Sequence, residues 1–247
     1  MKASFFSMPR LLTLVSLSLL CVSCSDEQDA AVRAAAEQGN LPALQQALLE
    51  GGHAHQDQFM NPLLLAAENG HADCIKALLE SGARADWHNE LGYTPLMLAV
   101  QEKHTDCALL LLEAGANPNR HYRGEGTVLA RAADNGDRVL VVALLKAGAK
   151  AAEADAHGFT ALMAAAGAGN VDCLAPLLTA GSQIEVKDKR GLNALMYAAI
   201  GGRENCIRAL LNAGAQRDAM TSEGLNALFF AEAYEHEGCV RLLKNAE

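Results

Sequence analysis

The sequence predicts an all-α repeat solenoid, and three observations support that prediction. Similar segments begin every 33 residues, at positions 61, 94, 127, 160, 193 and 226, and chance does not keep such a register. Hydrophobic residues make up 51% of the chain but aromatic ones only 4%. The apolar residues are mostly Ala and Leu, which favours closely packed helices over a β-sandwich. Helix-capping and helix-ending residues also recur at fixed places in each segment.

The N-terminal segment is typical of an export signal. Lys2 and Arg10 supply positive charge ahead of an uncharged, Leu-rich run over residues 11–22. A membrane-spanning helix needs about 20 apolar residues. The shorter run therefore fits the hydrophobic part of a secretory signal peptide.

The residues LLCVSC at the end of this run resemble a bacterial lipobox, in which small residues precede a cysteine that receives a diacylglyceryl group. The resemblance makes Cys24 the lipid-attachment residue, although Cys21 stands where the family usually has Leu. It implies an exported protein, anchored by its N-terminal lipid in a bacterial envelope and facing the periplasm. Ser25 after the acceptor favours the outer membrane. A soluble periplasmic or secreted protein, released by ordinary signal peptidase, is the alternative.

Each 33-residue unit predicts two short helices followed by an extended loop. The first helix follows an Asn or Thr whose side chain can accept a hydrogen bond from a free amide of the first turn, and Pro62 and Pro95 suit the position after the cap. The second helix has apolar residues at helical spacing, as at Ile75 and Leu78. It ends at glycines that suit a left-handed position after the helix, namely Gly82, Gly115, Gly148, Gly181 and Gly214.

These features divide the chain into a signal peptide with the lipobox (residues 1–23), a short tether (24–28) and a repeat domain (29–247). The repeat domain comprises an irregular first unit (29–60), repeats at 61–93, 94–126, 127–159, 160–192 and 193–225, and a truncated cap at 226–247. Polar residues are expected at both ends of the stack, because a terminal unit has only one neighbour. Lys244, for example, stands where earlier units carry Leu.

Three segments of the repeat carry a recognisable pattern: GYTPLMLAV, AGANPN and SGARAD. With the period of 33, they resemble the ankyrin repeat, whose signature is T-P-L-H-x-A. The resemblance covers about residues 29–247. It implies stacked helix-turn-helix units with extended loop or hairpin tips, and a non-catalytic function in protein–protein interaction. The signature His is absent, so apolar packing must replace its hydrogen bonds at Leu64, Met97, Ala130, Met163, Met196 and Phe229.

The cysteines beyond Cys24 form one column of the repeat. They are Cys74, Cys107, Cys173, Cys206 and Cys239, and Leu140 fills the remaining place. A column that accepts Cys or Leu is expected to be a small buried apolar site with free thiols. Disulfides between units are disfavoured, because packed helices lie about 8–10 Å apart and a disulfide needs Cα atoms within about 7 Å.

The histidines that fall in the repeat or its first loop have a structural interpretation. The turn between the two helices of a unit, which we expect to face solvent, carries His71, His104 and His236. The first loop carries the only close cluster, His53, His55 and Asp57. A surface metal site is the alternative for that cluster, and the structural interpretation is favoured.

The formal net charge of −9 and the spread of the charged residues argue against a nucleic-acid partner. The chain has no H-E-x-x-H motif and no nucleophile elbow. Its Gly-rich stretches at 124–126 and 167–169 fall on a repeat turn or a helix rather than after a buried strand. The sequence therefore predicts no enzyme, no cofactor and no metal site.

Positions that vary between units indicate where a protein partner would bind. In ankyrin proteins the loop tips and the exposed edge of the first helix line a concave surface. Carried over by position, the resemblance assigns partner binding to tip residues Trp87, His88, Glu90, Tyr93, His121, Tyr122, Arg123, His157, Phe159, Lys189 and Arg190. The only Trp and two of the four Tyr lie there, and these residue types dominate interface hot spots. We expect an envelope-tethered scaffold or adaptor with an unidentified protein partner. An exported effector or inhibitor that acts on a protein away from the producing cell is the alternative.

Overall fold

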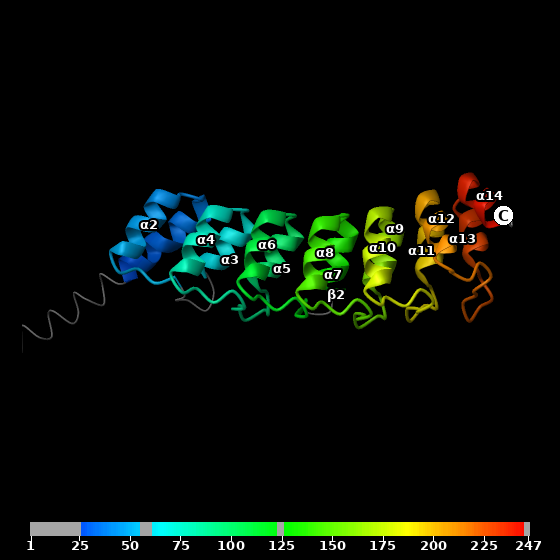
Figure 1. Ribbon diagram of the computed structural model, residues 1–247, viewed down its shortest axis with the longest axis horizontal. Helices are drawn as coiled ribbons and strands as arrows, with labels where there is room; N and C mark the ends of the chain where they lie inside the picture. Colours follow the sequence, from blue (N-terminus) through cyan, green and yellow to red (C-terminus); the bar gives the residue numbers. More distant parts are fainter. Residues whose placement is uncertain (1–25, 55–60, 123–125, 245–247) are drawn as a thin grey trace, which may run out of the picture.

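Pairs of helices stacked side by side form an elongated row in the computed structural model (Figure 1). It describes residues 26–54, 61–122 and 126–244. The row begins with helical residues 26–38, which include residues 26–28 of the predicted tether. The predicted all-α repeat solenoid is confirmed.

The predicted signal peptide and Cys24 lie outside the described residues. Within the described ranges, none of the helices combines the length and the apolar character that crossing a membrane requires.

The first helix of each regular unit begins after its predicted capping residue. These helices are α3 (Pro62–Glu68), α5 (Pro95–Gln101), α7 (Val128–Asn135), α9 (Ala161–Ala168), α11 (Ala194–Ile200) and α13 (Ala227–Ala233). Thr94 Oγ1 accepts a hydrogen bond from the Met97 amide at 3.2 Å, and Asn193 Oδ1 accepts one from the Met196 amide at 3.0 Å. The side chain thus satisfies an amide that the helix itself leaves without a partner.

Except in the C-terminal cap, one cap residue and then a left-handed glycine follow the second helix of each unit. These helices are α2 (Leu41–Leu49), α4 (Ala72–Glu80), α6 (Thr105–Glu113), α8 (Arg138–Lys146), α10 (Val171–Thr179), α12 (Glu204–Asn212) and α14 (Glu237–Lys244). Gly82 and Gly214, which follow α4 and α12, have φ angles of 92° and 94°. Only a glycine adopts this left-handed conformation without strain, which is why the helix stops there.

Two layers of helices enclose the core. Each first helix packs on the next first helix, each second helix on the next second helix, and the two helices of a regular unit on each other. The position of the missing signature His is buried in five units, as Met163 and Met196 illustrate, so apolar packing replaces its hydrogen bonds as predicted. Phe229 in the cap is the exception at 46% exposure, because no described unit covers that side of α13.

The cysteine column lies in the same core. All five cysteines beyond Cys24 are buried and free, and Leu140 is buried in the sixth place. Burial is the first cause that raises the pKa of Cys173 and Cys206 to about 11, because a thiolate loses its hydration there. The prediction of small buried apolar sites with free thiols is confirmed.

The turn column between the two helices faces solvent only in part, because its side chains also contact the preceding unit. His71, His104 and His236 are half-buried, because each ring reaches across to the preceding unit. The Nε2 group of His104 donates to the carbonyl oxygen of Glu68 at 3.1 Å, and His71 and His236 make equivalent bonds. The side chain at this position therefore ties each unit to its neighbour.

A loop leads from each second helix to the next first helix, and all of these loops run along the lower edge of Figure 1. One forms a short antiparallel hairpin from β1 (His121–Tyr122) and β2 (Gly126–Thr127), with His121 opposite Thr127. We call the ends of these loops the tip row; its described parts are residues 86–93, 119–122, 152–159, 185–192 and 218–225.

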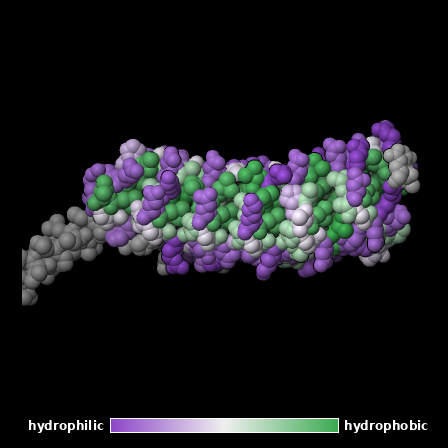
Figure 2. All heavy atoms as spheres, viewed as in Figure 1, coloured by the Kyte–Doolittle hydropathy of each residue, from purple (hydrophilic) through white to green (hydrophobic). Residues whose placement is uncertain are grey.

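The second helices form a separate, outer face of the row, above the loops in the view of Figure 1. Figure 2 shows hydrophobic residues along this face, separated by polar side chains. Leu49 and Val139 are exposed on it by 84% and 60%. At the C-terminal cap, Lys244 pairs with Glu232 through an Nζ–Oε1 distance of 2.7 Å, as expected of a polar end.

Candidate functional site

In four of the tips, one short polar side chain accepts hydrogen bonds from amides of its own turn. The Oδ1 atom of Asp188 accepts hydrogen bonds from the amides of Arg190 and Leu192 at 2.9 and 2.8 Å. Asp155 binds two amides of its tip in the same way, and Asn89 binds one. A side chain that bonds to amides a few residues ahead holds the turn without help from a partner.

Hydrogen bonds also join neighbouring tips to one another. The Lys189 amide donates to the carbonyl oxygen of His157 at 2.9 Å, and Lys187 Nζ donates to that of Met220 at 2.7 Å. Glu185 Oε1 accepts from the Gln216 amide at 2.7 Å. The tip row is therefore a connected surface rather than a set of independent loops.

The predicted binding residues divide into exposed side chains and half-buried ones. The exposed side chains are His88, Glu90, His121, His157, Lys189 and Arg190. Three aromatic residues, Trp87, Tyr93 and Phe159, are half-buried, and the last two pack against the core. Tyr93 and Phe159 thus hold their tips against the core, and all three aromatic residues offer a partner only part of their surface.

Two predicted residues fall at the hairpin end. Arg123 and the side chain of Tyr122 lie outside what the structure describes. His121 at the base of the hairpin has its Nε2 atom 3.1 Å from Glu153 Oε1 in the next loop.

The most developed polar cluster on this face joins one tip to the first helix of the next unit. The Tyr197 hydroxyl on α11 donates to Asp188 Oδ2 at 2.8 Å and accepts a hydrogen bond from Arg190. The Arg190 guanidinium also lies over the Tyr197 ring, 5.6 Å from its centroid. Phe159 from the preceding tip meets the same ring edge-on, with centroids 5.1 Å apart. These four residues form what we call the Tyr197 cluster.

The charges of the Tyr197 cluster are set by its hydrogen bonds. Burial opposes the ionised form of Asp188, but hydrogen bonds from the Leu192 amide, the Tyr197 hydroxyl and Arg190 outweigh it and lower the pKa of this carboxyl. The pKa of Tyr197 is raised, first by burial and then by its bond to Asp188. At neutral pH the cluster therefore holds an ionised carboxylate, a neutral phenol and a guanidinium.

Sequence reasoning missed three residues of this face. Asp188 and Tyr197 escaped it because their contact depends on how two units stack. Leu91, 59% exposed on its tip, could have been found, because it shares a column of the repeat with His157 and Arg190. A large apolar side chain at that exposure is available to a partner.

The residues that could have indicated a metal site do not form one in the described ranges. No group of three or more His, Cys, Asp or Glu is arranged there to hold a metal ion. His53 is instead paired with Asp29, with 3.1 Å between Nδ1 and Oδ1. His55 and Asp57 lie outside the described residues.

The fold and the face just described are those of an ankyrin-repeat protein, and the comparison of sequences agrees. The family model for ankyrin repeats (3 copies) matches residues 32–122, 118–188 and 168–247. The chain therefore belongs to the ankyrin-repeat family. No curated protein sequence matches it significantly.

Several solved structures are similar to this chain. The human ASB11 ankyrin repeat domain is 26% identical with a TM-score of 0.74, and the match covers 87% of this chain and 98% of that one. An ankyrin repeat domain (ABAYE2397) from Acinetobacter baumannii AYE is 29% identical with a TM-score of 0.67, over 74% and 95%. A third match is to the Bd0816 predatory endopeptidase from Bdellovibrio bacteriovorus in complex with immunity protein Bd3460, at 29% identity and a TM-score of 0.66, over 74% and 97%.

Proposed function

We propose that this protein is a non-catalytic binding module that captures a protein partner on its tip row and the adjoining edge of the first helices. The observation that supports this most is that the tips are closed and hydrogen-bonded to one another before any partner arrives. A surface that is already ordered loses little conformational entropy on binding, so more of the contact energy remains as affinity.

The Tyr197 cluster is the proposed centre of this surface. Arg190 is 68% exposed at its side chain, yet it is held by Asp188 and by Tyr197. A guanidinium fixed in this way can pair with a carboxylate of a partner without first being ordered. Arginine and tyrosine are also the residue types that most often carry interface binding energy.

The tether is the second part of the proposal. Cys24 is proposed to carry the lipid, which would hold the solenoid at the bacterial envelope on the periplasmic side. The support is the lipobox-like segment LLCVSC. In addition, Cys24 lies outside the cysteine column, so the structural role of that column does not explain it. Metabolic labelling with palmitate should tag the wild-type protein and miss Cys24→Ala. An unlabelled, soluble wild-type protein would contradict the tether.

The identity of one relative favours a second, more specific function, namely inhibition of an enzyme. The related chain of Bdellovibrio bacteriovorus is an immunity protein found in complex with an endopeptidase. If this protein likewise inhibits a peptidase, adding it in stoichiometric amount should abolish the activity of the captured partner. A scaffold or adaptor would leave that activity unchanged.

Site-specific photo-crosslinking in cells tests the binding face. A photoreactive residue at Glu90 or Lys189, both exposed on tips, should give a crosslinked adduct with the partner. The same residue at Lys76, exposed on the outer helix α4, is the matched control and should give none. Adducts from position 76 alone would place the partner on the other face and refute the proposal.

A further inference from the structure

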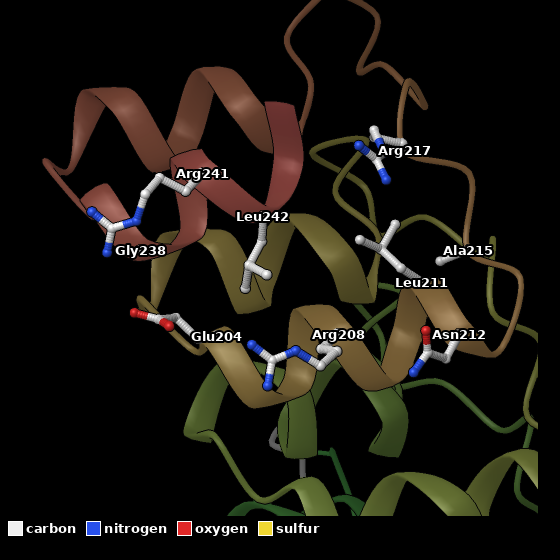
Figure 3. A pocket seen from close by; sticks show the side chains of 9 residues that line it. All are labelled: Glu204, Arg208, Leu211, Asn212, Ala215, Arg217, Gly238, Arg241 and Leu242. Carbon is white, nitrogen blue, oxygen red and sulfur yellow. The ribbon is translucent and has the colours of Figure 1, made fainter. Parts of the chain in front are cut away.

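A groove of about 620 Å³ lies between the last two outer helices, α12 and α14. Arg208 comes from α12, Arg241 and Leu242 come from α14, and Arg217 comes from the loop after α12 (Figure 3). Figure 3 shows Leu242 projecting from α14 toward α12, with Arg217 at one end of the groove and Glu204 at the other. This arginine groove belongs to the outer helices and takes no residue from the Tyr197 cluster.

The three arginines are departures from the repeat and not part of its scaffold. Arg208 and Arg241 share one column, where the earlier regular units have Lys76, Leu109, Val142 and Ala175. Arg217 stands where those units have Ala85, Pro118, Ala151 and Ile184. Stacking of the helices therefore does not require positive charge at any of these positions, and one groove has gained it at all three.

Gly238 at the first turn of α14 is a fourth departure. The same position is acidic in three earlier units, as Asp73, Asp106 and Asp172. A Cβ atom at Gly238 would lie 1.7 Å from Glu204 Oε1, so any side chain there would force that carboxylate to move. Glycine at this position keeps the end of the groove open and leaves out a negative charge.

The groove has an apolar floor with guanidinium groups at its rim. Leu211 and Leu242 are half-buried in the floor, and Arg208 and Arg241 are exposed. Arg217 is held in place, because its Nη1 atom donates to the carbonyl oxygen of Leu243 at 3.2 Å. Arg241 forms a weak ion pair with Glu237, one helical turn away, because 3.9 Å separates Arg241 Nη1 from Glu237 Oε2.

We propose that the arginine groove binds an acidic segment of a partner protein. Carboxylates of the segment pair with Arg208 and Arg241, for which the planar guanidinium offers two parallel donors. An apolar side chain of the segment rests on Leu211 and Leu242. The groove thus adds to the tip row a second contact surface with a defined chemical preference, on a different face of the solenoid.

The overall charge favours a peptide over an anionic membrane as the occupant. The chain carries a net charge of −9, and Glu204 and Glu237 stand beside the arginines. A flat anionic surface would approach this acidic surround as well as the groove and would be repelled by it. A single segment in the groove meets three arginines against one carboxylate, that of Glu204.

Fluorescence anisotropy with a short labelled peptide of Glu and Leu tests the proposal on the whole protein. The wild-type protein should bind this peptide at low salt and bind a Gln-for-Glu version much more weakly, because the contacts are charged. The double variant Arg208→Gln/Arg241→Gln should bind the acidic peptide about tenfold more weakly or worse. Circular dichroism checks that the two substitutions, both at exposed positions, leave the fold intact.

The matched control is Lys76→Gln/Lys146→Gln, which removes the same charge from exposed positions on α4 and α8. Lys76 occupies the same repeat column as Arg208. This control should bind the peptide as the wild-type protein does. Equal weakening in both double variants, equal affinity for the neutral peptide, or no peptide binding at low salt would overturn the proposal. Binding to phosphatidylglycerol vesicles in place of the peptide, lost in Arg208→Gln/Arg241→Gln, would also overturn it in favour of a membrane. None of these outcomes bears on crosslinking from the tip row, so the two proposals fail separately.

Discussion

The replacement Tyr197→Phe removes one hydroxyl group from the Tyr197 cluster and keeps the ring that packs on Phe159. The hydroxyl donates to Asp188 Oδ2 at 2.8 Å, and the Asp188 side chain is only 4% exposed. A hydrogen bond to a charged group contributes about 1.5–3 kcal/mol. Because Arg190 still reaches the same oxygen from Nε at 3.3 Å, we expect a loss near the lower end, about 1.5–2 kcal/mol of unfolding free energy.

The loss should depend on pH in a defined direction. The pKa of Asp188 is lowered in the fold, so its ionised form stabilises the protein at pH values above the ordinary value of 3.8. This contribution is lost as the pH falls through the lower pKa of the folded state. Tyr197→Phe removes one of the bonds that lower the pKa. The difference in unfolding free energy between this variant and the wild-type protein should therefore be largest at neutral pH and shrink below pH 3.8.

Equilibrium unfolding in urea, followed by circular dichroism, measures this difference. The matched control is Tyr234→Phe, because Tyr234 is 56% exposed and its ring stacks on His236. The control should change the unfolding free energy by less than about 0.5 kcal/mol. The comparison requires equal m-values, since units of a solenoid can unfold separately. Equal losses in the two variants, or a Tyr197→Phe loss that stays constant into acid, would refute the reasoning.

Four further predictions rest on backbone contacts and on burial. Gly201→Ala should cost about 1–3 kcal/mol in thermal unfolding, because its Cβ would lie 2.6 Å from the Gly167 carbonyl oxygen. Gly167→Ala, whose Cβ would come no closer than 3.6 Å to Tyr197, should be neutral or raise stability by up to about 1 kcal/mol. Lys103→Gly should raise the unfolding free energy by about 0.5–1 kcal/mol, since Lys103 holds a φ of 64° where four other units have glycine. An unchanged urea midpoint would contradict this. Burial raises the pKa of Cys173 to about 11, so native protein at neutral pH should resist a thiol reagent until it unfolds; rapid labelling of the native protein would show the thiol to be accessible.

The helix pairs were predictable because the signals that start and stop them are local. Thr94 caps α5 by accepting a hydrogen bond from an amide three residues away. Gly82 ends α4, because it adopts a left-handed conformation one residue after the cap of that helix. Both effects act within one turn of helix. The same local signals recur in every unit, so the helix boundaries predicted for one unit apply to the others as well.

Contacts between units were harder to predict. His104 was expected to face solvent, yet it bonds to the carbonyl oxygen of Glu68 in the unit before it. Nothing within the unit of His104 requires that bond, because it forms only when the preceding unit stacks at the right distance. The same reason explains why Tyr197 was overlooked, since its partner Asp188 belongs to the preceding unit.

The amino-acid pattern was sufficient for the solenoid, its period of 33, its caps and the buried cysteine column, because each depends on neighbours along the chain or on one repeated environment. It was insufficient for the exposure of particular side chains. Tyr93 and Phe159 share a column predicted to meet a partner, but both are half-buried against the core, and Arg208 joins a groove with Arg217 and Arg241 that no single unit contains. Exposure depends on the side chain that arrives from the next unit, and that side chain differs from one unit to another even where the backbone repeats.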